Sequence, residues 1–218
     1  MAQSEVTTRS GEDLLDLADW RREVSQLYAD VRAMSETSPA GAWRHWVAVR
    51  EALFRHHPQS PVPPERREAF TAQHWEYDRD YRFEVAIEPA APGPAGGGLQ
   101  LPNSRDEAPA ISRVGVVEVP FPAGPRPLSV FWIAGYAGGL FLPFRDATNG
   151  TETYAAGRYV LDTAKGADLG GDLLERRLVL DFNFAYQPTC AFDPRWACPL
   201  APPENRLDIV VPVGERIG

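Results

Sequence analysis

The residues best suited to chemistry are concentrated in one stretch of the chain, between positions 141 and 205. This stretch mixes polar and thiol side chains with many aromatic, glycine and proline residues, and it is more polar than a packing core requires. Ligand pockets are lined by apolar and aromatic side chains with a few placed polar groups. The sequence therefore predicts a pocket here, with these ligand-binding residues: Arg145, Thr148, Tyr154, Arg158, Asn183, Tyr186, Arg195, Glu204 and Asn205.

Two carboxylates in this stretch, Asp146 and Asp181, are the candidates for general acid–base catalysis. The string DFNFAY, which starts at Asp181, alternates polar and aromatic residues as a half-buried strand does. Asp181 and Asn183 would then share one face, with Phe182 and Phe184 directed to the core. In a barrel lumen, burial would perturb the pKa of Asp181 and suit it to proton transfer. On the outer face it would be a solvated charge, and both interpretations stay open.

Three arginines could recognise an anionic group, because guanidinium pairs bidentately with carboxylate or phosphate. They are Arg145, Arg158 and Arg195. The structural alternative is that Arg145 flanks a hairpin and that Arg158 pairs across strands with Asp181. Glu204 and Asn205 have a similar pair of interpretations, since they end a proline-rich segment that could clamp the sheet or close a pocket.

Cys190 and Cys198 are the only cysteines, and the seven residues between them match neither a CxxC redox motif nor a zinc knuckle. A catalytic cysteine needs a base, usually histidine, and none occurs in residues 75–218. We therefore expect structural thiols, as in a reducing cytoplasm. A disulfide stays open, because Asp193-Pro194 favours a turn between the two cysteines.

No metal site is expected, and no cofactor can be named from the sequence. His45, His56 and His57 lie in helical sequence, where no carboxylate or further histidine recurs at helical spacing to complete a coordination sphere. The three glycines at 96–98 do not form a phosphate-binding loop, because they lie in no GxxxxGK[ST] or GxGxxG context.

Two amphipathic helices are predicted to precede the stretch described above. Apolar residues recur every three or four positions over residues 12–34, and Ser38-Pro39 is typical of the start of a second helix that ends before Pro58. These helices can pack as a hairpin. A proline-rich connector over residues 58–64 and a short helix over residues 65–73 would follow.

The rest of the sequence has the pattern of short antiparallel strands. Asn149-Gly150 predicts a type I′ turn that pairs residues 140–148 with 151–161. We predict an α+β fold in which the helical hairpin precedes a barrel-like or strongly curved antiparallel sheet. The predicted domains are residues 1–57, 58–80 and 81–218, with a Gly/Pro-rich loop at 89–109. The predicted strands are residues 81–87, 111–119, 128–134, 140–144, 153–161, 178–183 and 207–213.

Composition narrows the class of protein. The net charge of −8 argues against a nucleic-acid partner, which calls for a basic face. No segment approaches the ~18 apolar residues of a membrane span, so no membrane partner is expected. The first twenty residues lack the apolar core of a signal peptide, which makes the cytoplasm the expected location. The oligomeric state cannot be predicted.

The strings PFRDATNGTETY and GRY, followed by DFNFAY and a CPLAPPEN ending, resemble a bacterial family known as domain of unknown function 1684. The resemblance extends over residues 40–216. It brings no established activity, and it implies only that twelve polar residues occupy positions characteristic of the family. These are Asp146, Thr148, Thr153, Tyr154, Arg158, Asp181, Asn183, Tyr186, Cys190, Cys198, Glu204 and Asn205.

The chain departs from the family pattern at three places. Ala155 and Ala156 replace two glycines before Gly157, Gln187 replaces an asparagine, and Phe192 replaces a tyrosine. The missing hydroxyl at position 192 counts against any mechanism that would use it.

Three hypotheses for function follow. The first is a small-molecule-binding protein with a pocket formed by residues 141–205, in which enzymatic action on a small acidic metabolite is left open. The second is a flavin-binding barrel. The third is a non-enzymatic interaction module whose partner surface is the helical hairpin with Trp43 and Trp46.

Overall fold

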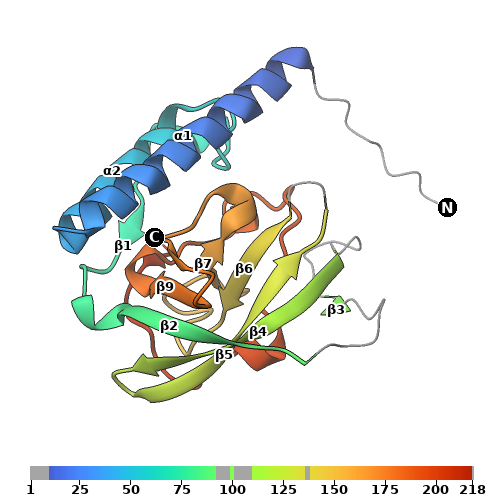
Figure 1. Cartoon of the computed structure of the whole chain (residues 1–218). Coiled ribbons are helices and arrows are strands. Elements are labelled where there is room, and N and C mark those ends of the chain that lie inside the picture. Colours follow the sequence, from blue (N-terminus) through green and yellow to red (C-terminus); the bar gives the residue numbers. More distant parts are fainter. Residues whose placement is uncertain (1–9, 92–98, 101–109, 136–137, 218) are drawn as a thin grey trace.

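A helical hairpin lies across one end of a strongly curled antiparallel sheet (Figure 1). The computed structural model describes residues 10–91, 99–100, 110–135 and 138–217. Within these residues the order of elements is two long helices followed by strands, which confirms the predicted α+β fold. No helix in the described ranges is both long and apolar enough to cross a membrane.

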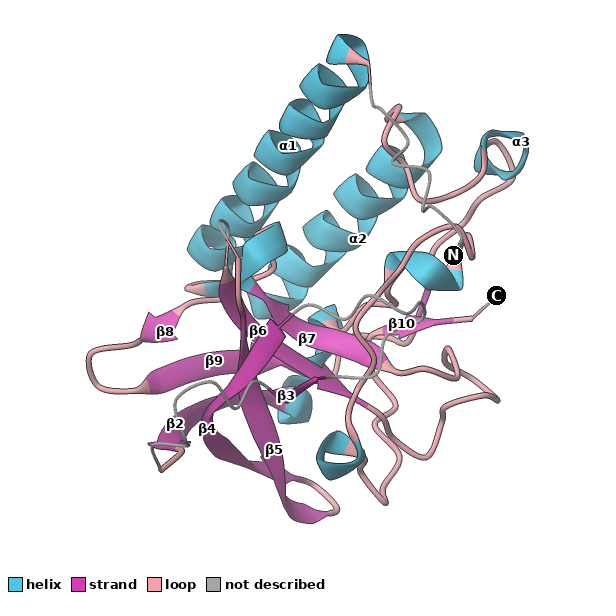
Figure 2. Cartoon of the chain, turned by 90° about the vertical axis from the view of Figure 1, so that its right-hand side faces the viewer, coloured by secondary structure: helices cyan, strands magenta, loops and turns pink. Residues whose placement is uncertain are grey.

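The two predicted helices are α1 (Gly11–Ser35) and α2 (Pro39–His56), and they pack against each other as a hairpin. Ser10 and Asp13 form a capping box at the start of α1. Ser38 caps α2, with Pro39 in the first turn as predicted. Figure 2 shows that both helices lie on the same side of the sheet.

The segment after the hairpin is less helical than predicted. Only α3 (Pro64–Arg67) forms in the region where a helix over residues 65–73 was expected. The chain then extends into β1 (Gln73–His74), which pairs with β10 (Glu215–Arg216) near the end of the chain. This long-range pairing explains why the local helical signal at Gln73 was misleading.

The main sheet has the order β7-β6-β5-β4-β2-β9-β8 within the described residues, and every neighbouring pair is antiparallel. The short strand β3 (Leu99–Gln100) pairs with β4, and the rest of the predicted 89–109 loop, at residues 92–98 and 101–109, lies outside the described residues. The other strands are β2 (Arg82–Pro89), β4 (Ala110–Phe121), β5 (Gly124–Ile133), β6 (Gly139–Phe144), β7 (Arg158–Asp162), β8 (Gly171–Asp172) and β9 (Arg177–Asp181).

Three local predictions were wrong. Asn149-Gly150 is not a tight hairpin turn, because the pairing of β6 with β7 ends at Phe144 and Arg158 and the strands are joined by the long excursion 145–157. Residues 207–213 form no strand, although their backbone hydrogen-bonds to residues 145–147. The DFNFAY string leaves β9 after Asp181 and forms a 3₁₀ turn.

Two apolar clusters stabilise the fold. One fills the curled sheet and includes Val117, Leu128, Phe144 and Phe182. The other joins the helices to the sheet, where the Trp46 and Phe184 rings meet edge to face at 5.4 Å. Phe182 and Phe184 therefore belong to different clusters and do not share one strand face.

Candidate functional site

Asp146 and Arg158 form a fully buried ion pair, with 3.4 Å between Arg158 Nη2 and Asp146 Oδ1. Arg158 also donates to the backbone oxygens of Val211, at 3.0 Å from Nη2, and of Val213, from Nη1. Burial lowers the pKa of Arg158, and the Asp146 carboxylate opposes that shift. Arg158 thus pairs with Asp146 and not with Asp181, and its two terminal nitrogens bind groups of the fold itself.

The partners of Asp146 are also internal. Its Oδ1 accepts from Thr148 Oγ1 at 2.8 Å and its Oδ2 from the backbone N–H of Val211 at 2.8 Å. Thr148 and Thr153 share a further hydrogen bond of 2.8 Å between their hydroxyl oxygens. Both oxygens of the predicted catalytic carboxylate are therefore engaged in holding residues 146–153 against the 205–213 segment.

Asp181 is 1% exposed, and burial raises its pKa to about 6, against the effect of hydrogen bonds from Asn183 and the charge of Arg82. Asp181 Oδ1 accepts from the backbone and side-chain amides of Asn183 at 3.0 and 2.7 Å. The Asn183 side chain in turn exchanges two hydrogen bonds with the backbone of Asp78, at 2.8 and 2.7 Å. The carboxyl group has the pKa of a general acid, but it stabilises a turn.

Asn205 is fully buried and holds strands together. Its side chain bonds to the backbone N–H and C=O of Ser129, at 2.7 and 2.9 Å, and to the Pro143 carbonyl at 2.7 Å. Glu204 beside it is exposed and pairs with Arg113 at 2.8 Å. Of these two predicted ligand-binding residues, Asn205 therefore holds the strands together and Glu204 forms a surface ion pair.

The side chains of the remaining predicted arginines have other partners. Arg145 Nε donates to the Ala156 carbonyl at 3.3 Å. Arg195 is exposed and pairs with Asp193 at 3.0 Å. The three arginines predicted to bind an acid therefore do not converge on one site.

Cys190 and Cys198 are buried and are not joined by a disulfide. The backbone N–H of Cys190 donates to Cys198 Sγ at 3.3 Å, and the Thr189 hydroxyl lies 3.1 Å from the same sulfur. Tyr154 hydrogen-bonds to Cys190, and burial is the main reason why the pKa of Tyr154 rises to about 12. The structure thus brings together three of the predicted residues, but none of them lines the interface cavity between the hairpin and the sheet.

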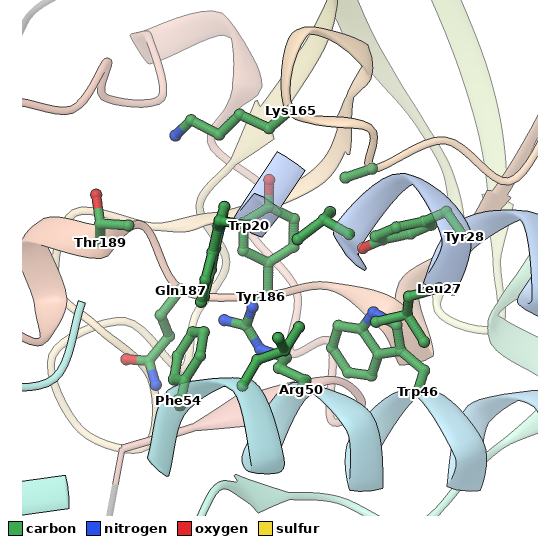
Figure 3. A pocket seen from close by; sticks show the side chains of 13 residues that line it. Trp20, Leu27, Tyr28, Trp46, Arg50, Phe54, Lys165, Tyr186, Gln187 and Thr189 are labelled. Carbon is green, nitrogen blue, oxygen red and sulfur yellow. The ribbon is translucent and has the colours of Figure 1, made fainter. Parts of the chain in front are cut away.

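A cavity of ≈ 80 Å³, here called the interface pocket, lies between the helical hairpin and the sheet (Figure 3). Figure 3 shows Trp46, Arg50 and Phe54 entering it from α2, with Lys165, Tyr186 and Thr189 on the walls contributed by the sheet domain. Its lining is Trp20, Val24, Leu27, Tyr28, Trp46, Arg50, Leu53, Phe54, Lys165, Ala167, Tyr186, Gln187 and Thr189.

Arg50 is the central polar residue of this pocket. Three aromatic rings surround its guanidinium carbon, with centroids at 4.2 Å for Phe54, 5.0 Å for Tyr186 and 5.5 Å for Trp46. Its Nη2 donates to Glu215 Oε2 at 2.9 Å, so β10 supplies the counter-ion from behind the pocket.

Sequence reasoning missed Arg50, although a signal was present. Trp46, Arg50 and Phe54 are spaced four apart on the predicted helix, so they share one face. A cation in the middle of an apolar helical face is unusual unless it has a partner or a ligand.

Lys165, the single lysine in the sequence, lies on the opposite wall and its side chain is 54% exposed. Its Nζ is 3.8 Å from Asp162 Oδ2, and the Tyr186 hydroxyl donates to the same oxygen at 3.3 Å. Burial raises the pKa of Asp162, while Lys165 and Tyr186 oppose that shift. Burial also raises the pKa of Tyr28 to about 12, so this pocket phenol stays protonated at neutral pH.

Comparisons with known proteins give a family but no activity. A family model described as "Protein of unknown function (DUF1684)" matches residues 69–216. The fold is similar to the solution NMR structure of an uncharacterised protein of Haloarcula marismortui, with 30% identity and a TM-score of 0.56. That match covers 84% of this chain and 98% of the other chain. No curated protein matches the chain.

Proposed function

The chain belongs to the DUF1684 family of proteins of unknown function, and on that premise we propose that it binds a small carboxylic acid with an apolar body in the interface pocket. One observation carries the proposal. Arg50 and Lys165 are the two charged side chains in the lining of the pocket, and both are cations. The other lining side chains are apolar or are uncharged polar groups. The acidic partners of the two cations, Glu215 and Asp162, stand behind the lining.

Arg50 has donors left for a ligand. Guanidinium has five N–H groups, and the hydrogen bond to Glu215 uses one of them. Its Nε is buried and has no hydrogen-bond partner among the described residues. A buried donor of this kind favours an incoming acceptor, because an unmade hydrogen bond costs desolvation free energy.

The rest of the lining suits an apolar body. Trp20, Leu27, Leu53 and Phe54 offer aromatic and aliphatic surface, while Gln187 and Thr189 add neutral hydrogen-bonding groups at one side. A ligand that places its carboxylate between Arg50 and Lys165 would bury its hydrocarbon part against the two helices. This division of polar and apolar contacts is typical of small-molecule sites.

The size of the pocket favours a small acid over a flavin. A volume of ≈ 80 Å³ is room for several water molecules, and drug-sized ligands fill pockets of roughly 300–1,000 Å³. An isoalloxazine ring would require the hairpin to move away from the sheet. We therefore propose an acid at most about the size of hexanoate or benzoate, and we assign no reaction to it.

The interaction-module hypothesis gains no support from the hairpin. Trp43 and Trp46, its proposed partner surface, are 8% and 1% exposed and pack against the sheet domain. Of the ligand-binding residues predicted from the sequence, Tyr186 alone lines the interface pocket. Thr189, which also lines it, was not among those predicted. The proposal therefore assigns recognition of the acid to Arg50 and Lys165, in place of Arg145, Arg158 and Arg195.

The single lysine allows a direct test. The protein would be acetylated with an N-hydroxysuccinimide ester, with and without benzoate, phenylacetate or hexanoate, and the modified positions measured by mass spectrometry. We expect at least one acid to slow the acetylation of Lys165 several-fold and to leave the α-amino group, an internal control, unchanged. The neutral analogues benzyl alcohol and hexanol should protect Lys165 far less.

A pair of variants separates charge recognition from general stabilisation. Lys165→Gln should abolish the rise in melting temperature caused by the acid that protects, whereas Lys165→Arg should keep it. Arg126→Gln, which removes an exposed ion pair to Asp208, serves as the matched control. Equal protection by acids and alcohols, or no protection by any acid, would show that the pocket does not recognise carboxylates.

A further inference from the structure

Several hydrogen bonds converge on the sulfur of Cys198. It accepts from the backbone N–H of Cys190 at 3.3 Å and from the Cys190 thiol, and the Thr189 hydroxyl, which can donate to it, lies 3.1 Å away. Sulfur is a weak acceptor as a thiol and a much better one as a thiolate. A set of donors around one sulfur therefore favours its anionic form.

The contacts of Cys190 favour its neutral thiol form. Its thiol donates to Cys198, and its own sulfur accepts from the Tyr154 hydroxyl. The result is a chain of hydrogen bonds that runs from Tyr154 through Cys190 to Cys198. Both side chains are buried, at 8% and 1% exposure, and the Cys198 sulfur lies 3.3 Å from the Cys190 backbone nitrogen, so the two thiols are close neighbours.

The charges nearby agree with this polarity. The donated thiol hydrogen bond is the main reason why the pKa of Cys198 falls to about 6, with smaller contributions from Thr189 and the Lys165 charge, while burial opposes the shift. The same hydrogen bond and burial raise the pKa of Cys190. Tyr154 and Tyr159, the other titratable groups that face the pair, stay neutral because burial raises both of their pKa values.

We infer that Cys198 and Cys190 are a peroxide-oxidisable pair, in which Cys198 is the nucleophile and Cys190 the resolving thiol. The Cys198 thiolate attacks a hydroperoxide oxygen, breaks the O–O bond and becomes a sulfenic acid, and the leaving oxygen takes a proton to form water. Cys190 then attacks the Cys198 sulfur, forms the disulfide and releases a second water. Two thiols and one hydrogen peroxide yield one disulfide and two waters.

The surroundings select a small oxidant. The 3₁₀ turn Thr189–Ala191 that carries Cys190 separates two cavities. Thr189 lines the interface pocket, and Ala191 lines a second cleft of ≈ 510 Å³. Neither cysteine lines either cavity, so an oxidant must pass Thr189 or Ala191 to reach the sulfurs, which favours one as small as hydrogen peroxide over a bulky thiol reagent. This inference does not depend on the proposed acid ligand.

The test uses the whole protein treated with hydrogen peroxide at pH 7. We expect the intact mass to fall by two hydrogens, and a peptide in which Cys190 and Cys198 are cross-linked. Cys190→Ser should stop at the sulfenic acid, trapped with dimedone at position 198, and Cys198→Ser should not react at all. Far-ultraviolet circular dichroism and thermal unfolding of each variant show that its fold is retained.

The pH dependence supplies a second reading that a merely structural pair of thiols would not give. The oxidation rate of the folded protein should change by less than about 1.5-fold between pH 7 and 8, whereas an unperturbed thiol speeds up roughly eightfold. Thr189→Val, which removes a donor to the sulfur, should restore part of that rise.

Three outcomes would overturn the inference. They are an unchanged mass under conditions that oxidise glutathione, dimedone addition at Cys190 in the Cys198→Ser protein, and an eightfold rise in rate between pH 7 and 8. A variant that fails to fold does not suspend the test, since the mass and the pH profile of the native protein decide it.

Discussion

Arg158 and Arg50 are both buried arginines with a carboxylate partner, yet they belong to regions of different kinds. Arg158 has Asp146 and two backbone carbonyls around it and faces no cavity described above. Arg50 has Glu215 on one side and the interface pocket on the other. The Nε of each arginine lacks a hydrogen-bond partner among the described residues, but only Arg50 borders the interface pocket, where a ligand could supply one.

The comparison separates polar density from function. In the region of Arg158, polar side chains hydrogen-bond to the backbone of the 205–213 segment, as a neighbouring strand would do. These hydrogen bonds stabilise the fold and are not offered to a ligand. In the region of Arg50, few polar groups are present, and they border open space. A cluster of polar residues in a sequence therefore indicates first that buried backbone groups there need hydrogen-bond partners, and only second that a ligand binds.

The largest loss of stability should come from breaking the buried ion pair of Arg158 and Asp146. Arg158→Met leaves the Asp146 carboxylate buried without its counter-ion, so we expect a loss of about 3–5 kcal/mol in the free energy of unfolding, measured in urea. The double variant with Asp146→Asn should recover part of it, because the orphaned charge is removed. A loss below about 1 kcal/mol would show that the cluster is not essential to the fold.

A pH series sharpens the structural assignment of Asp181. Its pKa is about 6 in the folded protein and roughly 3.9 when unfolded, so the folded state holds the proton more tightly. Its contribution to stability is therefore greatest below pH 4 and declines as pH rises to 6, by about 3 kcal/mol in total.

Asp181→Asn should remove this slope. The stability difference between variant and wild type, from urea unfolding at pH 4 to 7, should then change by about 2 kcal/mol in favour of the variant. A difference that is independent of pH would contradict the raised pKa.

The smallest effect is expected at Glu204, a residue predicted to bind ligand that lies on the surface. Glu204→Ala removes an exposed ion pair with Arg113, and such pairs contribute about 0–1 kcal/mol. Thermal unfolding should be almost unchanged, and protection of Lys165 by the acid should persist. Loss of that protection would reinstate the 199–205 segment as part of the site.

The fold was largely predictable because its long elements carry regular patterns. The apolar spacing along α1 and the Ser38-Pro39 start of α2 are local signals, and the structure follows them. The wrong predictions fell where side chains replace backbone partners. Asn149, for example, bonds to the backbone of Asp146 and Tyr154 and so shapes a long excursion, not a tight turn.

The candidate site was much less predictable. The interface pocket draws residues from four separate segments, around positions 20–28, 46–54, 165–167 and 186–189. The turn at Asp181 could have been predicted from the sequence, because an aspartate carboxylate often accepts the backbone N–H two residues later, as it does here from Asn183, and this ends the strand. The ion pair of Arg50 with Glu215 could not have been predicted, because the two residues are 165 positions apart in the sequence.

The pairing of β1 with β10 also bears on biosynthesis, because it joins residues that leave the ribosome at very different times. The helices emerge early, yet Arg50 gains its counter-ion only when Glu215 has been synthesised. At roughly 5–20 residues per second, that delay is on the order of ten seconds. Throughout it, Trp43 and Trp46 lack the sheet that later covers them, which makes the nascent hairpin a natural client for chaperones.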